Sequence, residues 1–92
     1  MAPRWMDSSG KHGIQRGDQI HAILHATFSA ELEDEAETGR IMLYIGPAHP
    51  QTKYELEILV HEFPDTGDDA RIFHAMELWP KFRAFREEHT NG

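Results

Sequence analysis

The chain has 92 residues, no cysteine and a formal net charge of −7. A chain of this length allows one domain with a modest core and is too short for a two-domain enzyme with a cofactor crevice. The absence of cysteine excludes a disulfide framework, a thiol nucleophile and a thiolate zinc site, and the negative charge argues against a strongly basic nucleic-acid binder. We expect a single domain over residues 1–92, with residues 1–6 and 88–92 frayed.

The sequence gives no sign of a membrane segment or an export signal. No apolar run approaches the roughly 20 residues of a membrane span. Residues 1–7 lack the apolar stretch of a signal peptide. We therefore expect a cytoplasmic protein with no membrane partner.

The first third of the chain predicts two helical segments. Residues 7–9 (Asp-Ser-Ser) can cap a short helical turn that ends near His12, where Gly13 favours the left-handed conformation that stops a helix. Residues 16–27 have the i, i+3, i+4, i+7 spacing of an amphipathic helix, and the residues in that pattern are Ile20, Ile23, Leu24 and Thr27.

An acidic segment separates this helix from the next predicted element. Its members are Glu31, Glu33, Asp34, Glu35 and Glu37. It could repel RNA or meet a basic partner, but a solvated loop is the ordinary role of such a charge run.

Three strands are predicted next, joined by short turns. They cover residues 40–45, closed by Gly46-Pro47, then residues 53–63 and residues 71–78. Successive strands with short turns favour an antiparallel meander of three to four strands. With helices before and after the sheet, the expected class is α+β with the helices on one face.

The junction between the last strand and the last helix is the most informative region. Period-2 alternation places Ile72, His74 and Met76 on one face of the strand, with residues 71, 73, 75 and 77 on the other. Pro80 suits the first turn of a helix. On a wheel of about 100° per residue, Phe82, Phe85 and His89 share one face, with Arg83 and Arg86 on one flank and Lys81 on the other.

The order of these motifs resembles the BrnT-like toxins of bacterial type II toxin–antitoxin modules, which are related to the RelE ribonucleases. The resemblance extends over residues 5–86 and begins with Lys11-His12-Gly13-Ile14 ahead of the amphipathic helix. It is closest to small actinobacterial relatives in which His-Ala-Met leads into Pro-Lys-aromatic, as His74-Ala75-Met76 and Pro80-Lys81-Phe82 do here.

The resemblance implies a RelE/BrnT-like α+β domain that cleaves mRNA without a metal or another cofactor. Such cleavage needs a base for the 2′-hydroxyl, cations for the phosphate and an acid for the leaving oxygen. His74 would be the base or acid, His12 the second proton carrier, and Lys81 and Arg83 the groups that hold the phosphate. Further RNA contacts would come from Arg71, Arg86 and Lys11.

The expected partners are a cognate antitoxin protein and mRNA or the ribosome. The chain has Met76, Leu78 and Trp79 where such toxins usually carry basic residues. A toxin-like interaction domain that binds a protein and has no catalytic activity is therefore the alternative.

Several of these residues also have a plainer interpretation. His74 can be a satisfied core histidine, because its predicted face carries Ile72 and Met76. Lys11 and His12 before Gly13 are typical of a helix C-terminus. Trp79 and Phe82 could stack on RNA bases, but closing the core is the more common role of such aromatics.

Two further sets of residues invite a chemical role. Glu55 and Glu57 could be general bases, although alternating acids on an antiparallel strand usually face solvent. His21 and His25 have the spacing of a two-histidine metal site, with Asp18 on the same flank, which gives a third and weaker hypothesis of a metal or small-ligand binder. No third ligand is indicated by the sequence.

Overall fold

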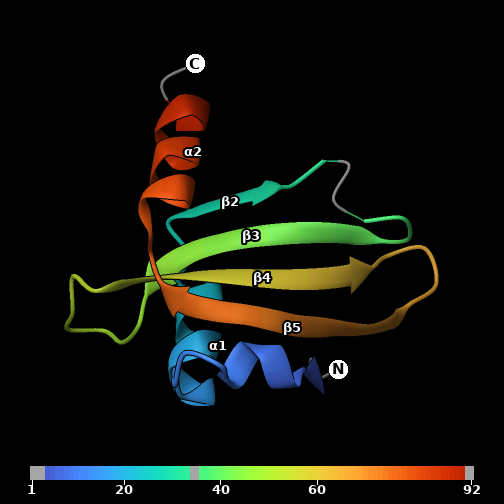
Figure 1. Cartoon of the computed structure of the whole chain (residues 1–92), viewed down its shortest axis with the longest axis horizontal. Helices are drawn as coiled ribbons and strands as arrows, with labels where there is room; N and C mark the ends of the chain where they lie inside the picture. Colours follow the sequence, from blue (N-terminus) through green and yellow to red (C-terminus); the bar gives the residue numbers. More distant parts are fainter. Residues whose placement is uncertain (1–3, 34–35, 91–92) are drawn as a thin grey trace.

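Five strands form one mixed sheet, with two α-helices, in the computed structural model, which describes residues 4–33 and 36–90 (Figure 1). The elements in chain order are β1 (Arg4–Trp5), the 3₁₀ helix η1 (Asp7–Gly10), α1 (Arg16–Leu24), β2 (Phe28–Glu31), β3 (Arg40–Pro47), β4 (Glu55–Phe63), β5 (Asp68–Glu77) and α2 (Pro80–Thr90). The strand order is β1-β5-β4-β3-β2, and β1 is parallel to β5 while the other neighbours are antiparallel. The predicted α+β class is confirmed, but the sheet has more strands than expected and is mixed.

Secondary structure reaches close to both ends of the described chain. Arg4 and Trp5 pair with Arg71 and Ile72 at the edge of the sheet, and α2 continues to Thr90. Of the residues expected to fray, 1–6 and 88–92, residues 1–3 and 91–92 lie outside the described part. No helix within residues 4–33 and 36–90 has the length and apolar character needed to cross a membrane.

The strand β2 lies between the predicted helix and most of the acidic segment, where no strand was expected. The helix α1 ends at Leu24, three residues earlier than predicted, because the following residues alternate with a period of two. Phe28 and Ala30 are partly buried, whereas Ser29 and Glu31 are exposed. Of the acidic segment, Glu31 thus belongs to a strand; Asp34 and Glu35 lie outside the described residues.

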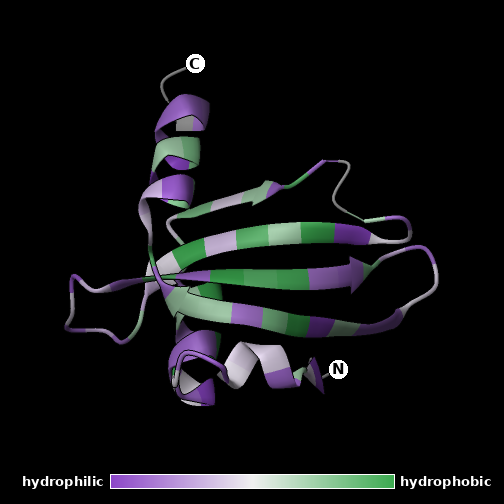
Figure 2. Ribbon diagram, viewed as in Figure 1, coloured by the Kyte–Doolittle hydropathy of each residue, from purple (hydrophilic) through white to green (hydrophobic). Residues whose placement is uncertain are grey.

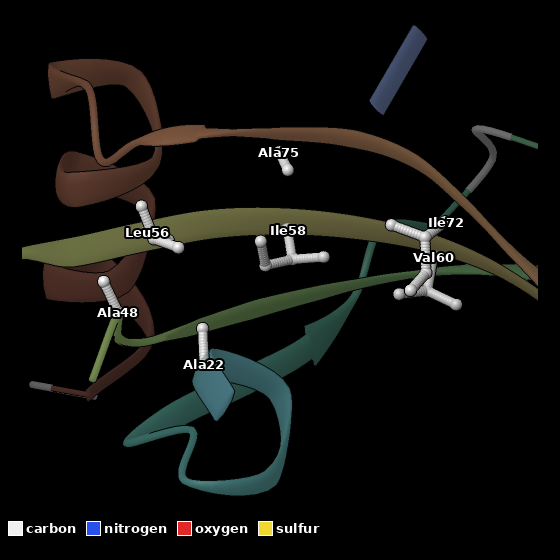
Figure 3. Close-up of a cluster of buried hydrophobic side chains, with 7 residues drawn as sticks. All are labelled: Ala22, Ala48, Leu56, Ile58, Val60, Ile72 and Ala75. Atoms are coloured by element: carbon white, nitrogen blue, oxygen red, sulfur yellow. The ribbon is translucent and has the colours of Figure 1, made fainter. Parts of the chain in front are cut away.

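The face of the sheet that carries α1, hereafter the α1 side, holds the larger core (Figure 3). Its buried members are Ala22, Ala48, Leu56, Ile58, Val60, Ile72 and Ala75. The predicted helix stripe is only partly right, because α1 turns Gln19 and Ala22 to the sheet and leaves Leu24 74% exposed. The helix comes so close to Gly46 of β3 that there is no room for a side chain at this position.

The opposite face, hereafter the α2 side, holds a second core. Leu43 and Ile45 of β3 pack there with Leu78 and with Phe82 of α2, as the predicted helix face requires. The hydropathy colouring of α2 alternates along the helix, with hydrophobic segments between hydrophilic ones (Figure 2). Trp79 is 58% exposed, so the expectation that it closes the core is wrong; Leu78 does so instead.

Candidate functional site

A β-bulge in β5 determines which residues reach the α2 side. The register between β4 and β5 passes from Leu59↔His74 to Val60↔Ile72, so Phe73 is the extra residue on β5. Cross-strand partners point to the same face, which places His74 with Leu59 on the α2 side and Ile72 with Val60 on the α1 side. The prediction that Ile72 and His74 share a face is therefore wrong, because it assumed an unbroken period of two.

The central feature of the α2 side is a hydrogen bond between the side chains of His74 and Glu57. His74 Nε2 lies 2.7 Å from Glu57 Oε2, and the backbone N–H of Trp79 donates to Glu57 Oε1 at 2.9 Å. Only 3% of Glu57 is exposed, whereas the side chain of His74 is 26% exposed. The expectation that Glu57 faces solvent is wrong, since its face of β4 is covered by the start of α2.

This hydrogen bond fixes the orientation and the tautomer of the imidazole. A carboxylate oxygen only accepts hydrogen bonds, so Nε2 of His74 carries the proton that it shares with Glu57. The Nδ1 atom of a neutral His74 ring then has a free lone pair. His74 is thus oriented as a residue that can accept a proton at Nδ1, with a carboxylate in place to stabilise the resulting imidazolium.

A second imidazole lies beside the first. The ring of His12 makes an edge contact with the ring of His74, with 5.9 Å between centroids. The 3₁₀ helix η1 holds this segment against the edge of β5, because Ser8 Oγ donates to the carbonyl oxygen of Phe73. Gly13, with φ of 74°, ends the turn as predicted. His12 itself is exposed, so a ligand at His74 can reach both rings.

A groove with a volume of about 540 Å³ begins next to His74 on the same side of the sheet. It is lined by Leu32, Ala36, Glu37, Thr38, Ile41, Leu59, His61, Phe73, Lys81 and Phe82. Two of these residues adjoin the imidazole directly: Leu59 is the cross-strand partner of His74, and Phe73 precedes it in the chain. The volume is in the range of ligand-binding clefts.

The structure brings only part of the predicted cationic set to this groove. Lys81 lines it, with Nζ 5.2 Å from the centre of the Phe82 ring. Arg83 is exposed and does not line the groove, so its predicted place beside Lys81 on one phosphate stays a prediction. Lys11 is exposed beside His12 in the chain.

The other two predicted RNA contacts lie elsewhere. Arg71 covers the ring of Phe63 at 5.0 Å, near the turn between β4 and β5. Arg86 forms an ion pair with Glu55 at 2.8 Å, which also gives Glu55 a structural partner in place of the general-base role considered above. Neither cation lines the groove.

The two histidines of α1 do not form the arrangement that a metal site needs. Their rings, His21 and His25, stack at 4.3 Å, and His21 Nδ1 lies 2.9 Å from the carbonyl oxygen of Pro47, to which an N–H can donate. Across residues 4–33 and 36–90, no group of three or more histidine, cysteine or acidic residues is placed to hold a metal ion. Asp18 does not complete a site with them.

Glu57 is the member of the cluster that sequence reasoning undervalued. A signal was present, because Glu57 alternates with Leu59 on a strand whose other face carries Leu56, Ile58 and Val60, and in a strand with apolar residues on both faces an acid can be buried instead of exposed. Its partner could not be inferred, since the bulge that turns His74 toward it leaves no clear mark in the sequence.

Comparisons of the chain with protein-family models, with curated proteins and with solved structures gave no match.

Proposed function

We propose that this protein is the toxin component of a type II toxin–antitoxin module, a RelE/BrnT-like endoribonuclease that cleaves mRNA without a metal. The observation that carries the proposal is the cluster of Glu57, His74 and His12 beside a groove that contains Lys81. Two imidazoles and a cation are the groups that 2′-hydroxyl chemistry requires. The cognate antitoxin would be its protein partner, and mRNA, free or on the ribosome, its substrate.

The proposed reaction follows from the orientation of His74. Its Nδ1 atom takes the proton of a ribose 2′-hydroxyl, and the 2′-oxygen attacks the neighbouring phosphorus to form a 2′,3′-cyclic phosphate. The bond to the 5′-oxygen of the next nucleotide breaks, and that oxygen takes a proton from protonated His12. Lys81 is the cation available to the phosphate, and Glu57 is a positioning residue that stabilises the charge gained by His74.

Expression of the chain alone in bacteria tests the proposal, with growth arrest and cleaved transcripts as the expected result. The purified protein should cleave single-stranded RNA in the presence of EDTA and leave the 2′-deoxy strand intact. His74→Gln should lower the cleavage rate by about 10²- to 10⁴-fold, with an unchanged circular dichroism spectrum. Unimpaired growth together with intact RNA would contradict the proposal.

A non-catalytic interaction domain is the second candidate, and one observation favours it. Leu78, at a position where such toxins carry a basic residue, is a buried part of the second core, while Trp79 beside it is exposed. Leu78 therefore contributes to core packing where such toxins have a cation that binds RNA. The exposed ring of Trp79 is available to contact a partner protein. Stable co-purification with the protein of the adjoining reading frame, without any RNA cleavage, is the result expected of this candidate.

A further inference from the structure

We infer that the groove beside His74 is a subsite for one unpaired nucleobase with an exocyclic amino group: adenine, cytosine or guanine in preference to uracil. The inference rests on the proposed function, which it extends from the reaction to the choice of substrate. Its basis is the chemistry of the groove lining, which combines an aromatic ring with hydrogen-bond acceptors.

One wall of the groove offers an aromatic surface. Phe73 is partly buried and lines the groove, whereas Phe82 is 7% exposed and has the ammonium group of Lys81 near its ring. Phe82 therefore belongs to the floor, and Phe73 is the ring that a base can stack on. Base–aromatic stacking is the usual means by which proteins hold single-stranded nucleic acid.

Other residues of the groove lining offer hydrogen-bond acceptors. His61 Nε2 lies 2.6 Å from the carbonyl oxygen of Thr38, so in a neutral ring it is the donor and Nδ1 is an acceptor. The carboxylate of Glu37 lines the same groove and is an acceptor as well. An exocyclic amino group supplies the matching N–H donors, while the O4 atom of uracil would meet a second acceptor and be disfavoured.

The position of the groove relative to the cluster suits a nucleotide. Phe73 and His74 are consecutive, with Cα atoms about 3.8 Å apart, and the bulge turns both side chains to the α2 side. A base stacked on Phe73 would place its ribose and phosphate near the two imidazoles. Glu37 belongs to the loop after β2 and lines the same groove.

Binding of non-cleavable RNA measures this preference separately from catalysis. We would titrate the ¹⁵N-labelled protein with 2′-O-methyl tetranucleotides of A, C, G and U and follow backbone amide signals. The first three should shift signals of Leu59, Phe73 and Lys81, and each should bind about 10-fold or more tightly than the U form, the size of one good base contact. Equal affinity for all four, tighter binding of U, or shifts confined to other regions would overturn the inference.

Three variants assign the effect to the groove. Phe73→Leu, which keeps an apolar side chain, should weaken binding of the A form by about 5-fold or more because it removes the stacking ring. Glu37→Gln should reduce the preference over U, since an amide can also donate to O4. Lys53→Gln, at an exposed position before β4 and outside the groove lining, is the matched control and should leave affinity and preference unchanged; a loss equal to that of Phe73→Leu would show general charge binding and contradict the subsite.

The outcome also separates this inference from the proposed function. Selective binding at the groove without cleavage of ordinary RNA would leave the base subsite standing and contradict the ribonuclease. Cleavage with the same rate at every base and no selective binding would support the ribonuclease and overturn the subsite. Tight binding of a partner protein at the groove, with no nucleic-acid binding, would overturn both.

Discussion

The strands β4 and β5 place apolar side chains on the α1 side of the sheet and a polar pair on the α2 side. On the α1 side, residues of β4 and β5 such as Ile58 and Ala75 pack in an apolar layer under α1. On the α2 side, the same strands place Glu57 and His74 next to a groove. The difference teaches that one sheet can bury an apolar layer on one face and a hydrogen-bonded polar pair on the other, because side chains alternate between its faces and a bulge can move one residue across.

The largest expected effect is on the α1 side. Ile58→Ala removes a fully buried side chain from the middle of the larger core, and we expect the free energy of unfolding to fall by about 2–5 kcal/mol. Urea denaturation of the purified variant measures it. Leu24→Ala is the control, since that side chain is largely exposed and its loss should change stability by no more than about 0.5 kcal/mol.

The close packing of α1 on the sheet gives the second prediction. A Cβ atom on Gly46 would lie 2.2 Å from the carbonyl oxygen of Ala22, so Gly46→Ala must push the helix away. We expect a loss of about 1–3 kcal/mol, the cost of overpacking, in the same urea assay.

Gly17 is the control for Gly46, because alanine at this position should stabilise the protein instead of destabilising it. A Cβ on Gly17, within α1, would meet nothing within 4 Å, so Gly17→Ala should stabilise the protein by up to about 1 kcal/mol through helix propensity. Equal destabilisation by both substitutions would contradict the packing described for α1.

The third prediction concerns the α2 side. Glu57→Gln keeps an oxygen that can accept from the Trp79 N–H, so only the charge-assisted part of the network is lost. We expect the free energy of unfolding to fall by about 1 kcal/mol, whereas the rate of the proposed cleavage should fall by at least about 10-fold. If the cleavage rate falls only as much as the folded fraction of the variant falls, Glu57 has only a structural role.

The tautomer of His74 gives an independent measurement of the same interaction. In the unsubstituted protein, ¹⁵N chemical shifts should show the proton of the neutral His74 ring on Nε2, opposite the Glu57 carboxylate. Glu57→Gln should move the proton toward Nδ1, since an amide whose oxygen accepts from the Trp79 N–H presents its NH2 donor to His74 Nε2. A ring already protonated on Nδ1 would contradict the orientation on which the proposed base depends.

The sequence predicts the fold where a pattern is long and regular. The helix from Pro80 and the strands around Leu43 and Ile58 were found because their apolar periodicity extends over several turns or pairs. The short strand β2 was missed, since four residues after a helix carry little signal. The pairing of Glu57 with His74 was also missed, because register depends on a bulge that tertiary packing selects. The structure places the ring of His12 beside that of His74 and Lys81 in the groove lining, while the roles expected of them and of Arg83 stay predictions.

The smallest effect concerns a polar network at the edge of the α1 side. The hydroxyl of Tyr44 donates to Glu62 Oε2 at 2.7 Å, and Arg40 Nε donates to Oε1 of the same carboxylate at 2.8 Å. Burial, with a further contribution from Glu62, raises the pKa of Tyr44 to about 12. Because the folded-state pKa is raised above the ordinary value near 10, the stabilisation is fully present below pH 10 and is lost as the pH rises through about 12.

We therefore expect Tyr44→Phe to cost about 1 kcal/mol at pH 8, and the difference between it and the unsubstituted protein to shrink between pH 10 and 12. The chain has two tyrosines, so Tyr54→Phe leaves Tyr44 as the single phenol. In that variant, absorbance at the phenolate band should rise with a midpoint near pH 12 while circular dichroism still reports a folded chain. A midpoint near pH 10 in the folded state would contradict both the burial of the Tyr44 hydroxyl and its hydrogen bond to Glu62, because both raise the pKa.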